Sequence, residues 1–194
     1  MSRFVLATAN PDKAAQMRSI LEPLGLTVEE RPANIPDVDE TEDTLEGNSH
    51  LKAGAIARAT GRAAIADDTG LFVDALGGRP GVYSARYAGE RATYRQNVEK
   101  LLDELRFVAE PRLAQFRSVI VVAYPDGDWF GVEGVLEGAI SRHARGEGGF
   151  GYDPVFELLG NDRRTLAELS ADEKNAVSHR GLALRALVQE LGAR

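Results

Sequence analysis

The pattern of hydrophobic and polar positions predicts strands and helices in alternation. The chain begins with an apolar run at residues 4–8, which predicts a strand. Asn10 and Pro11 follow, and they are typical of a helix N-cap and a first helical position. Hydrophobic residues then recur at helical spacing to about Leu24, and Gly25 ends the helix. A short strand at residues 26–30 completes a strand–helix–strand unit of the βαβ type.

The remaining pattern extends this alternation. In order, we expect an irregular acidic segment at 31–43, a helix at 45–59, a strand at 63–66, a loop rich in glycine and proline at 77–89, an amphipathic helix at 93–107 with Tyr94 inward, and strands at 116–124 and 129–140. The turn Pro125-Asp126-Gly127-Asp128 predicts that the last two strands form a hairpin. A final helix is expected from Ser170, which has capping-box spacing with Glu173. We predict one α/β domain over residues 1–194, in two lobes with a cleft.

Composition and charge narrow the class of protein. With 194 residues, 43% of them hydrophobic and 27% charged, the chain is long enough and apolar enough for one well-packed globular core. The absence of cysteine excludes disulfides, thiol nucleophiles and cysteine–zinc sites. The net charge of −7 argues against nucleic acid as a partner, but it permits a small anionic substrate. Because no signal-peptide or membrane-length apolar run occurs, we expect a cytoplasmic protein without a membrane partner.

The segment Thr8-Ala9-Asn10-Pro11-Asp12-Lys13 is a candidate anion site. A strand that leads directly into a helix presents free backbone N–H groups and the positive end of the helix dipole to a ligand. The hydroxyl of Thr8 and the ammonium of Lys13 would add to this site. The alternative is an ordinary capped helix with an exposed lysine. The chain contains no Walker A pattern.

Asp67 and Asp68 are candidate acidic site residues at the end of the short strand at 63–66. Because side chains alternate along a strand, we expect only one of them to face a given site. A magnesium ion would compensate their charge and couple them to substrate phosphates. Glu40, in the acidic segment, is a candidate for a further metal ligand, and Lys52 is a candidate for a phosphate contact. The alternative for the aspartates is an acidic surface turn, that for Glu40 is a solvated loop, and that for Lys52 is an exposed helical lysine.

Two later segments could bind the rest of a nucleotide. The glycine-rich loop Gly146–Pro154 carries Phe150, Tyr152 and Asp153, and aromatic rings stack on bases while a carboxylate accepts ring N–H groups. The other reading is a turn whose two rings pack in the core. Lys174 and Ser178 share a helix face, with His179 and Arg180 beside them, so this segment could form a local positive patch. The alternative for this segment is a structural histidine beside lysine and arginine side chains that face solvent.

Taken together, these segments closely resemble the inosine triphosphate pyrophosphatase family, the nonstandard-purine (dITP/XTP) NTP pyrophosphatases. The resemblance spans nearly the whole chain and rests on motifs in family order: Leu6-Ala7-Thr8-Ala9-Asn10 with Lys13, Asn48 with Lys52-Ala53, Ala66-Asp67-Asp68-Thr69-Gly70-Leu71 with Val73-Asp74, Pro80-Gly81-Val82-Tyr83-Ser84-Ala85-Arg86-Tyr87, Gly148-Gly149-Phe150-Gly151-Tyr152-Asp153-Pro154, and Glu173-Lys174 with Ser178-His179-Arg180. Thr69 stands where the family usually has serine, and Ala9 where it usually has glycine or serine.

The resemblance implies a two-lobed mixed α/β sheet flanked by helices with a central substrate cleft, in a homodimer. It implies magnesium-dependent hydrolysis of ITP, dITP or XTP by water to the monophosphate and pyrophosphate, which removes these nucleotides from the pool. Asp68 would be the general base and a metal ligand, and Glu40 the second metal ligand. The substrate-binding residues would be Thr8, Ala9, Asn10, Pro11, Asp12, Lys13, Lys52, Thr69, Phe150, Gly151, Tyr152, Asp153, Lys174, His179 and Arg180.

Base selection has a physical rationale within this resemblance. Hypoxanthine and xanthine present a 6-oxo acceptor where adenine presents an amino donor. Donors from His179 or Arg180 would favour the oxo group, because adenine would leave two donors facing each other. A purine-nucleotide-binding regulator without catalysis is the alternative function. A different NTP hydrolase is disfavoured, because the chain has neither a Walker A loop nor a Nudix box.

Overall fold

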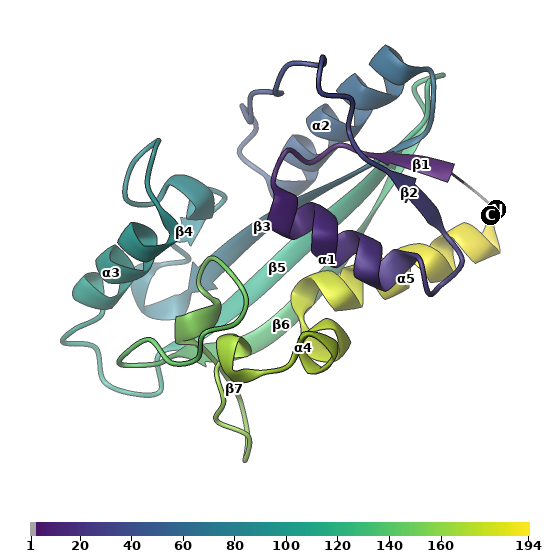
Figure 1. Cartoon of the computed structure of the whole chain (residues 1–194). Coiled ribbons are helices and arrows are strands. Elements are labelled where there is room, and N and C mark those ends of the chain that lie inside the picture. Colours follow the sequence, from purple (N-terminus) through teal and green to yellow (C-terminus); the bar gives the residue numbers. More distant parts are fainter. Residues whose placement is uncertain (1–2) are drawn as a thin grey trace. The chain divides into compact units, whose positions relative to one another are not determined.

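The structure is a computed structural model that describes residues 3–194 (Figure 1). Its helices are α1 (Pro11–Leu21), α2 (Leu45–Thr60), α3 (Tyr94–Glu104), α4 (Ala171–Val177) and α5 (His179–Ala193). Its strands are β1 (Arg3–Leu6), β2 (Thr27–Glu29), β3 (Ala64–Val73), β4 (Pro80–Gly81), β5 (Leu113–Ala123), β6 (Trp129–Ile140) and β7 (Phe156–Leu158). Short 3-10 turns lie at Asp74–Leu76, Ser84–Arg86, Asp153–Val155 and Leu166–Glu168.

Seven strands within residues 3–194 form one mixed sheet, in the order β2-β1-β3-β5-β6-β7 with β4 paired to β3. β1 is parallel to both β2 and β3, as expected for strands joined by α1 and α2. β4 and β7 pair antiparallel to β3 and β6. β5 and β6 are neighbours joined by a tight turn, in which the Tyr124 N–H donates to Asp128 O at 2.8 Å. The predicted α/β class and hairpin are therefore confirmed.

The described chain divides into two compact units. Unit 1 comprises residues up to Asp68, Ser118–Gly134 and Arg180–Arg194, and unit 2 comprises Thr69–Arg117 and Val135–His179. The boundaries fall inside β3, β5 and β6, so each of these strands contributes residues to both units.

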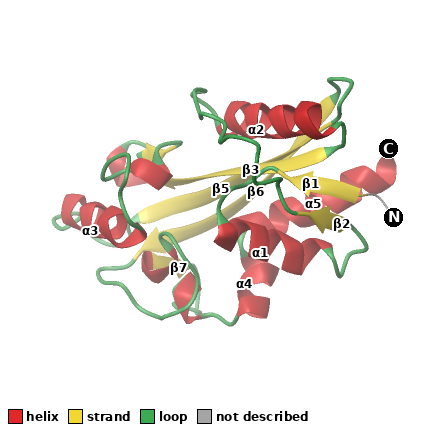
Figure 2. Cartoon of the chain, turned by 45° about the horizontal axis from the view of Figure 1, so that its top comes forward, coloured by secondary structure: helices red, strands yellow, loops and turns green. Residues whose placement is uncertain are grey.

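Unit 1 is a three-layer α/β arrangement. Figure 2 shows α2 above one face of its strands and α1 and α5 against the other. Small side chains such as Ala53 and Ala57 let α2 pack closely on Val5 and Val121, whereas larger ones such as Met17 and Leu184 fill the opposite layer. Capping residues fix the ends of the helices in this unit. Asn10 caps α1, and Gly61 ends α2 in the left-handed conformation (φ 64°).

Unit 2 has its own hydrophobic core. Leu101 and Leu105, near the end of α3, pack with Phe156 and with the strand residues Leu71 and Phe116. Tyr152 is part of this core, and its hydroxyl donates to Ser84 O at 2.8 Å. The core therefore anchors one end of the glycine-rich loop.

Two predicted boundaries and one predicted burial were wrong in ways that matter for the site. β3 continues from Ala64 to Val73, so Asp67 and Asp68 lie within a strand and not after it. The last helix is two helices, because Ser178 adopts an extended conformation (ψ 153°) between α4 and α5. Tyr94, predicted to point inward, is 43% exposed. No helix among residues 3–194 is both long and apolar enough to cross a membrane.

Candidate active site

The centre of the candidate site is β3, where Asp67 and Asp68 contact different helices. Asp67 contacts α1 and α5 through Lys13 and Arg180, whereas Asp68 contacts α2 through Lys52. This is the alternation expected of neighbouring residues in a strand. The two carboxylates therefore take their nearest basic partners from different helices. We call Lys13, Glu40, Lys52, Asp67, Asp68 and Arg180 of unit 1 the carboxylate cluster.

Asp67 is buried and anchors two cations. Arg180 donates to Asp67 Oδ2 from Nε at 3.0 Å and from Nη2 at 2.9 Å, and Lys13 Nζ lies 3.4 Å from the same oxygen. Burial alone would raise the pKa of the Asp67 carboxyl, but Lys13 and Arg180 together hold it well below its usual range. The carboxylate is thus ionised, and burial lowers the pKa of Lys13 despite this partner. Asp67 orients both basic side chains.

Asp68 and Glu40 share one lysine. Lys52 Nζ donates to Glu40 Oε1 at 2.7 Å and to Asp68 Oδ1 at 3.1 Å. Burial raises the pKa of Asp68 more than Lys52 lowers it, while the two carboxylates raise the pKa of Lys52 despite its burial. The predicted metal ligands, which lie 28 positions apart, are therefore within reach of one ammonium group.

These carboxylates fit a divalent cation of the magnesium type. Asp68 Oδ2 is buried and has no hydrogen-bond partner among the described residues. Across residues 3–194, no three acidic, histidine or cysteine side chains gather closely enough to hold a metal by themselves. Magnesium commonly uses one or two carboxylates and takes its other ligands from water and substrate phosphates. A carboxylate pair with an unsatisfied buried oxygen meets that requirement.

The turn before α1 is held by its own side chains. Asn10 Oδ1 accepts the N–H groups of Asp12 at 2.9 Å and Lys13 at 3.3 Å, and Thr8 Oγ1 accepts the Asn10 N–H at 3.1 Å. The Asn10 side chain therefore accepts the backbone N–H groups that were predicted to bind an anion. This is the arrangement of an ordinary capped helix, the alternative given above. Ala9 and Pro11 are exposed beside them.

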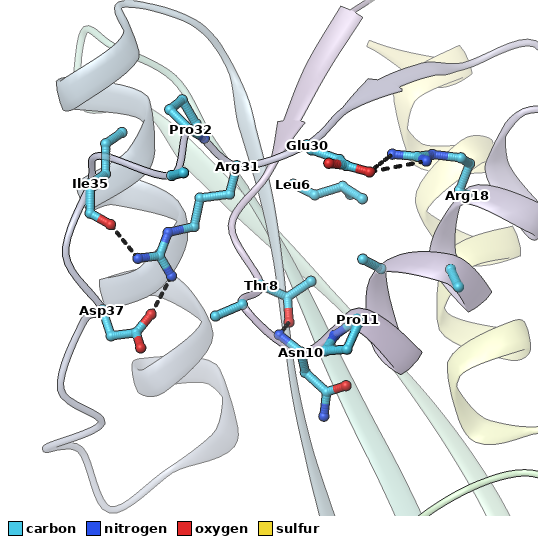
Figure 3. Close-up of a pocket in the computed structure, with 14 residues that line it drawn as sticks. Leu6, Thr8, Asn10, Pro11, Arg18, Glu30, Arg31, Pro32, Ile35 and Asp37 are labelled. Carbon is cyan, nitrogen blue, oxygen red and sulfur yellow. Dashed lines mark hydrogen bonds and ion pairs between the residues drawn. The ribbon is translucent and has the colours of Figure 1, made fainter.

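A cavity of about 560 Å³ adjoins this turn (Figure 3). Thr8 and Asn10 line it, together with two paired arginines. Arg31 donates to Asp37 Oδ1 and to Ile35 O, both at 2.5 Å, and Arg18 donates to Glu30 at 3.3 Å. The first arginine pins the acidic segment that leads to Glu40. The cavity is a surface feature of unit 1, and Lys13, Lys52 and Asp68 do not line it.

Unit 2 contains a second group of predicted residues, which we call the aromatic-loop cluster: Phe150, Asp153 and Lys174. Lys174, from α4, donates to Asp153 Oδ2, which also accepts the Phe150 N–H at 2.9 Å. The Lys174 Nζ lies 4.6 Å from the centre of the Phe150 ring. Gly149 has φ 71°, and a Cβ there would meet Asp153 Oδ2 at 2.2 Å, so this glycine lets the loop close on the carboxylate. Gly151 also has a positive φ, of 65°.

The neighbours His179 and Arg180 do not act as one patch. His179 is buried in unit 2 and stacks on Phe116 with ring centres 4.4 Å apart. Arg180 belongs to unit 1 and donates to Asp67 and to Gln16 Oε1, the latter at 2.6 Å. Thr69 is half-buried in β3 and lies in unit 2, directly after Asp68. Lys174 belongs with Asp153, so the predicted positive patch of the last helix is divided among three environments.

Sequence reasoning missed the role of Asp67 as an anchor and missed Gln16 altogether. The adjacent acidic pair gave no indication of which side chain meets which base, because its partners lie 54 and 113 positions away. The alternation along the strand separates the two carboxylates, but it does not identify the basic side chain that each one meets.

The fold and the carboxylate cluster define a class of protein: an α/β protein with acidic and basic side chains gathered on a central strand, suited to a polyanion and a divalent cation. The chain belongs to the Ham1 family, whose model matches residues 4–190. The resemblance found in the sequence is thereby confirmed.

Curated relatives match over nearly their whole length. The chain is 47% identical to the dITP/XTP pyrophosphatase of Bacillus subtilis (strain 168), with 100% of this chain and 98% of that protein covered. It is 48% identical to the dITP/XTP pyrophosphatase of Streptomyces avermitilis, with 97% and 96% covered. Among solved structures, a HAM1 protein from Coxiella burnetii has a TM-score of 0.89 at 40% identity, with both chains fully covered. The Ham1 protein of Staphylococcus aureus has a TM-score of 0.86 at 40% identity, with 99% of each chain covered.

Proposed function

We propose that this chain is a nucleoside triphosphate pyrophosphatase that hydrolyses nonstandard purine nucleotides, namely ITP, dITP and XTP, to the monophosphate and pyrophosphate. This reaction removes such nucleotides from the pool. The observation that carries the proposal is the arrangement of Asp68, Lys52 and Glu40 in a chain whose full-length relatives are named dITP/XTP pyrophosphatases. Hydrolysis of a phosphoanhydride needs charge neutralisation and an oriented water more than covalent catalysis, and this arrangement suits both needs.

The carboxylate cluster and the turn before α1 bind the triphosphate in this proposal. Asp68 is the general base that orients and deprotonates water. Lys52 contacts the phosphates, and Lys13 does so from a position that Asp67 fixes. Residues 8–12 complete the phosphate site, and the Asn10 carboxamide must release its backbone N–H groups if the phosphates are to use them. Arg180 is a positioning residue, because its Nε and Nη2 groups both donate to Asp67.

The aromatic-loop cluster binds the purine. The Phe150 ring offers a stacking surface, Asp153 offers an acceptor for ring N–H groups, and Lys174 fixes both. Gly151 and Tyr152 shape the loop, the latter from the core of unit 2. Thr69 contributes its hydroxyl next to Asp68. His179 is buried against Phe116. Its role as the donor to the 6-oxo group therefore stays a prediction.

A divalent cation is required by most enzymes that cleave such bonds, and we propose magnesium here. Asp68 and Glu40 would hold it, together with substrate oxygens and water. When bound, it would neutralise phosphate charge. Lys52 is placed to hold the two carboxylates together, since its ammonium contacts both of them.

The test is an NTP panel assayed separately for pyrophosphate and orthophosphate, with and without magnesium. We expect pyrophosphate from ITP, dITP and XTP, far more than from ATP or GTP. Asp68→Asn should abolish turnover with the fold retained. Asp103→Asn is the matched control, because it removes one exposed carboxylate of α3 and should leave turnover unchanged. Near-normal turnover in Asp68→Asn would remove Asp68 as the base.

The rival function, a purine-nucleotide-binding regulator, predicts a different result in the same assay. Tight binding of ITP with no product in the presence of magnesium would favour it. No separate feature of the described residues supports it over hydrolysis.

Glu40→Gln tests the second metal ligand. We expect the magnesium concentration for half-maximal activity to rise by about tenfold, because a neutral amide binds a hard cation less well. A magnesium titration of activity checks this, and manganese binding followed by electron paramagnetic resonance checks it without turnover. Glu42→Gln, two residues further along the same segment and exposed, is the control. Equal titrations for both variants would exclude Glu40 as a ligand.

The homodimer and the cytoplasmic location are part of the proposal. Light scattering on the eluting protein measures the first, with a mass near 42 kDa expected from a 21.0 kDa chain.

A further inference from the structure

Tyr94 is an exposed aromatic residue next to the ring proposed to bind the base. It is the first residue of α3 and is 43% exposed, although its helical spacing predicted an inward position. Its ring centre lies 6.0 Å from that of Phe150, with the two planes inclined at 38°. Two segments more than 50 positions apart thus bring two aromatic rings together within unit 2.

The backbone that carries each ring is held in place. Thr93 and Gln96 form a capping box, in which Thr93 Oγ1 accepts the Gln96 N–H at 3.2 Å and Gln96 Oε1 accepts the Thr93 N–H at 2.8 Å. This fixes the backbone from which Tyr94 extends. On the other side, Asp153 accepts the Phe150 N–H at 2.9 Å, and Lys174 lies over the Phe150 ring. The helix start that carries Tyr94 and the loop that carries Phe150 are therefore each held by their own hydrogen bonds.

An aromatic surface of this kind suits a planar base. Stacking on aromatic rings is tolerant of base identity, because every base has a π-face, and each stacked ring contributes to affinity. If Tyr94 were buried, core packing would account for an aromatic residue at this position. Nearly half of its surface is exposed, however, and is available to a ligand. The polar groups that would read the base edge, Asp153 and Lys174, lie directly beside Phe150.

We propose that Tyr94 is a substrate-binding residue, which contacts the purine base together with Phe150 and contributes affinity and not chemistry. The inference rests on the proposed function, which places the base at Phe150. It adds α3 to the segments that form the site, and it assigns Tyr94 the role of a second aromatic contact for purine nucleotides.

The test compares Tyr94→Ala, Tyr94→Phe and Tyr83→Ala. Tyr83 is the matched control: it is exposed, lies in unit 2, and packs with Arg86 instead of Phe150. We expect Tyr94→Ala to raise KM for ITP by about tenfold, the effect of one lost stacking contact. Tyr94→Phe should retain KM, because the ring is kept, and Tyr83→Ala should too. kcat should stay unchanged in all three.

A second measurement separates base binding from other effects. IMP should bind Tyr94→Ala about tenfold more weakly than wild type, whereas inorganic pyrophosphate, which has no base, should bind both equally. Equal KM values for Tyr94→Ala and wild type, or equal losses for IMP and pyrophosphate, would overturn the inference. The proposed function would stand in either case if wild type releases pyrophosphate from ITP. A wild type that releases none would instead refute the proposed function.

Discussion

Two adjacent aspartates illustrate how neighbouring residues acquire different chemistry. Asp67 lies among Lys13 and Arg180, which keep it ionised, whereas burial raises the pKa of Asp68 more than its lysine lowers it. The difference comes from strand alternation, which directs the two carboxylates to opposite faces of β3. Asp67 is thereby suited to hold the Lys13 and Arg180 side chains in place, and Asp68 is suited to interact with water and a metal ion.

Asp67→Asn tests the structural half of this division. Removing one charge leaves Lys13 and Arg180 without their buried counter-ion, so we expect a loss of about 3 kcal/mol in the free energy of unfolding. Urea denaturation followed by circular dichroism measures it. Asp103→Asn, which removes an exposed carboxylate, should change the free energy of unfolding little.

The stabilisation that Asp67 provides should depend on pH. The pKa of Asp67 is lower in the folded than in the unfolded chain, where it is about 3.9. Its stabilisation is therefore complete above about pH 5 and is lost as the pH falls below about 4, towards the folded pKa. The gap in unfolding free energy between wild type and Asp67→Asn should be constant from pH 5 to 8 and narrow only in stronger acid. A gap that already narrows between pH 7 and 6 would mean another group is responsible.

At the scale of elements, strand β6 shows how backbone packing limits side-chain choice. Gly138 pairs with Leu158 of β7, and a Cβ there would meet Glu157 O at 2.5 Å and the Phe156 ring at 2.4 Å. Gly131, in the same strand, has room, since its nearest neighbours would lie 3.4 Å away. The first glycine is required by a close approach of β7, and the second is not.

Gly138→Ala should therefore destabilise the protein by about 2 kcal/mol, because the backbone of β7 must shift to admit the methyl group. Gly131→Ala is the control within β6 and should leave stability unchanged within about 0.5 kcal/mol. Thermal unfolding of the two variants compares them directly. If both melt together, the close approach at Gly138 does not limit the packing of β7.

The elements themselves were largely predictable from the sequence. Capping residues and helical periodicity located α1, α2 and α3 to within a few residues, because these signals are local. The end of β3 was missed because aspartates are poor strand formers, whereas in the structure lysine and arginine partners compensate their charge there. The break at Ser178 was missed because the sequence around it keeps a helical pattern. Tyr94 was misplaced because periodicity cannot tell a core face from a ligand face.

At the scale of the whole molecule, the candidate site depends on contacts between distant segments. Motifs in family order indicated which residues to consider, and the structure showed how they group: Asp67 with Arg180, and Asp153 with Lys174. Periodicity and spacing could not supply these pairings, because they link residues up to 113 positions apart. We assign the carboxylate cluster of unit 1 to the phosphates and the aromatic-loop cluster of unit 2 to the base.

The most direct test of this account is ³¹P nuclear magnetic resonance of ITP incubated with the protein and magnesium. We expect the three triphosphate signals to be replaced by those of IMP and pyrophosphate, with no diphosphate intermediate and no orthophosphate. Signals of IDP and orthophosphate would place the cleavage at the other phosphoanhydride bond, and unchanged ITP would show that the protein does not catalyse this reaction. Either result would contradict the proposed pyrophosphatase activity.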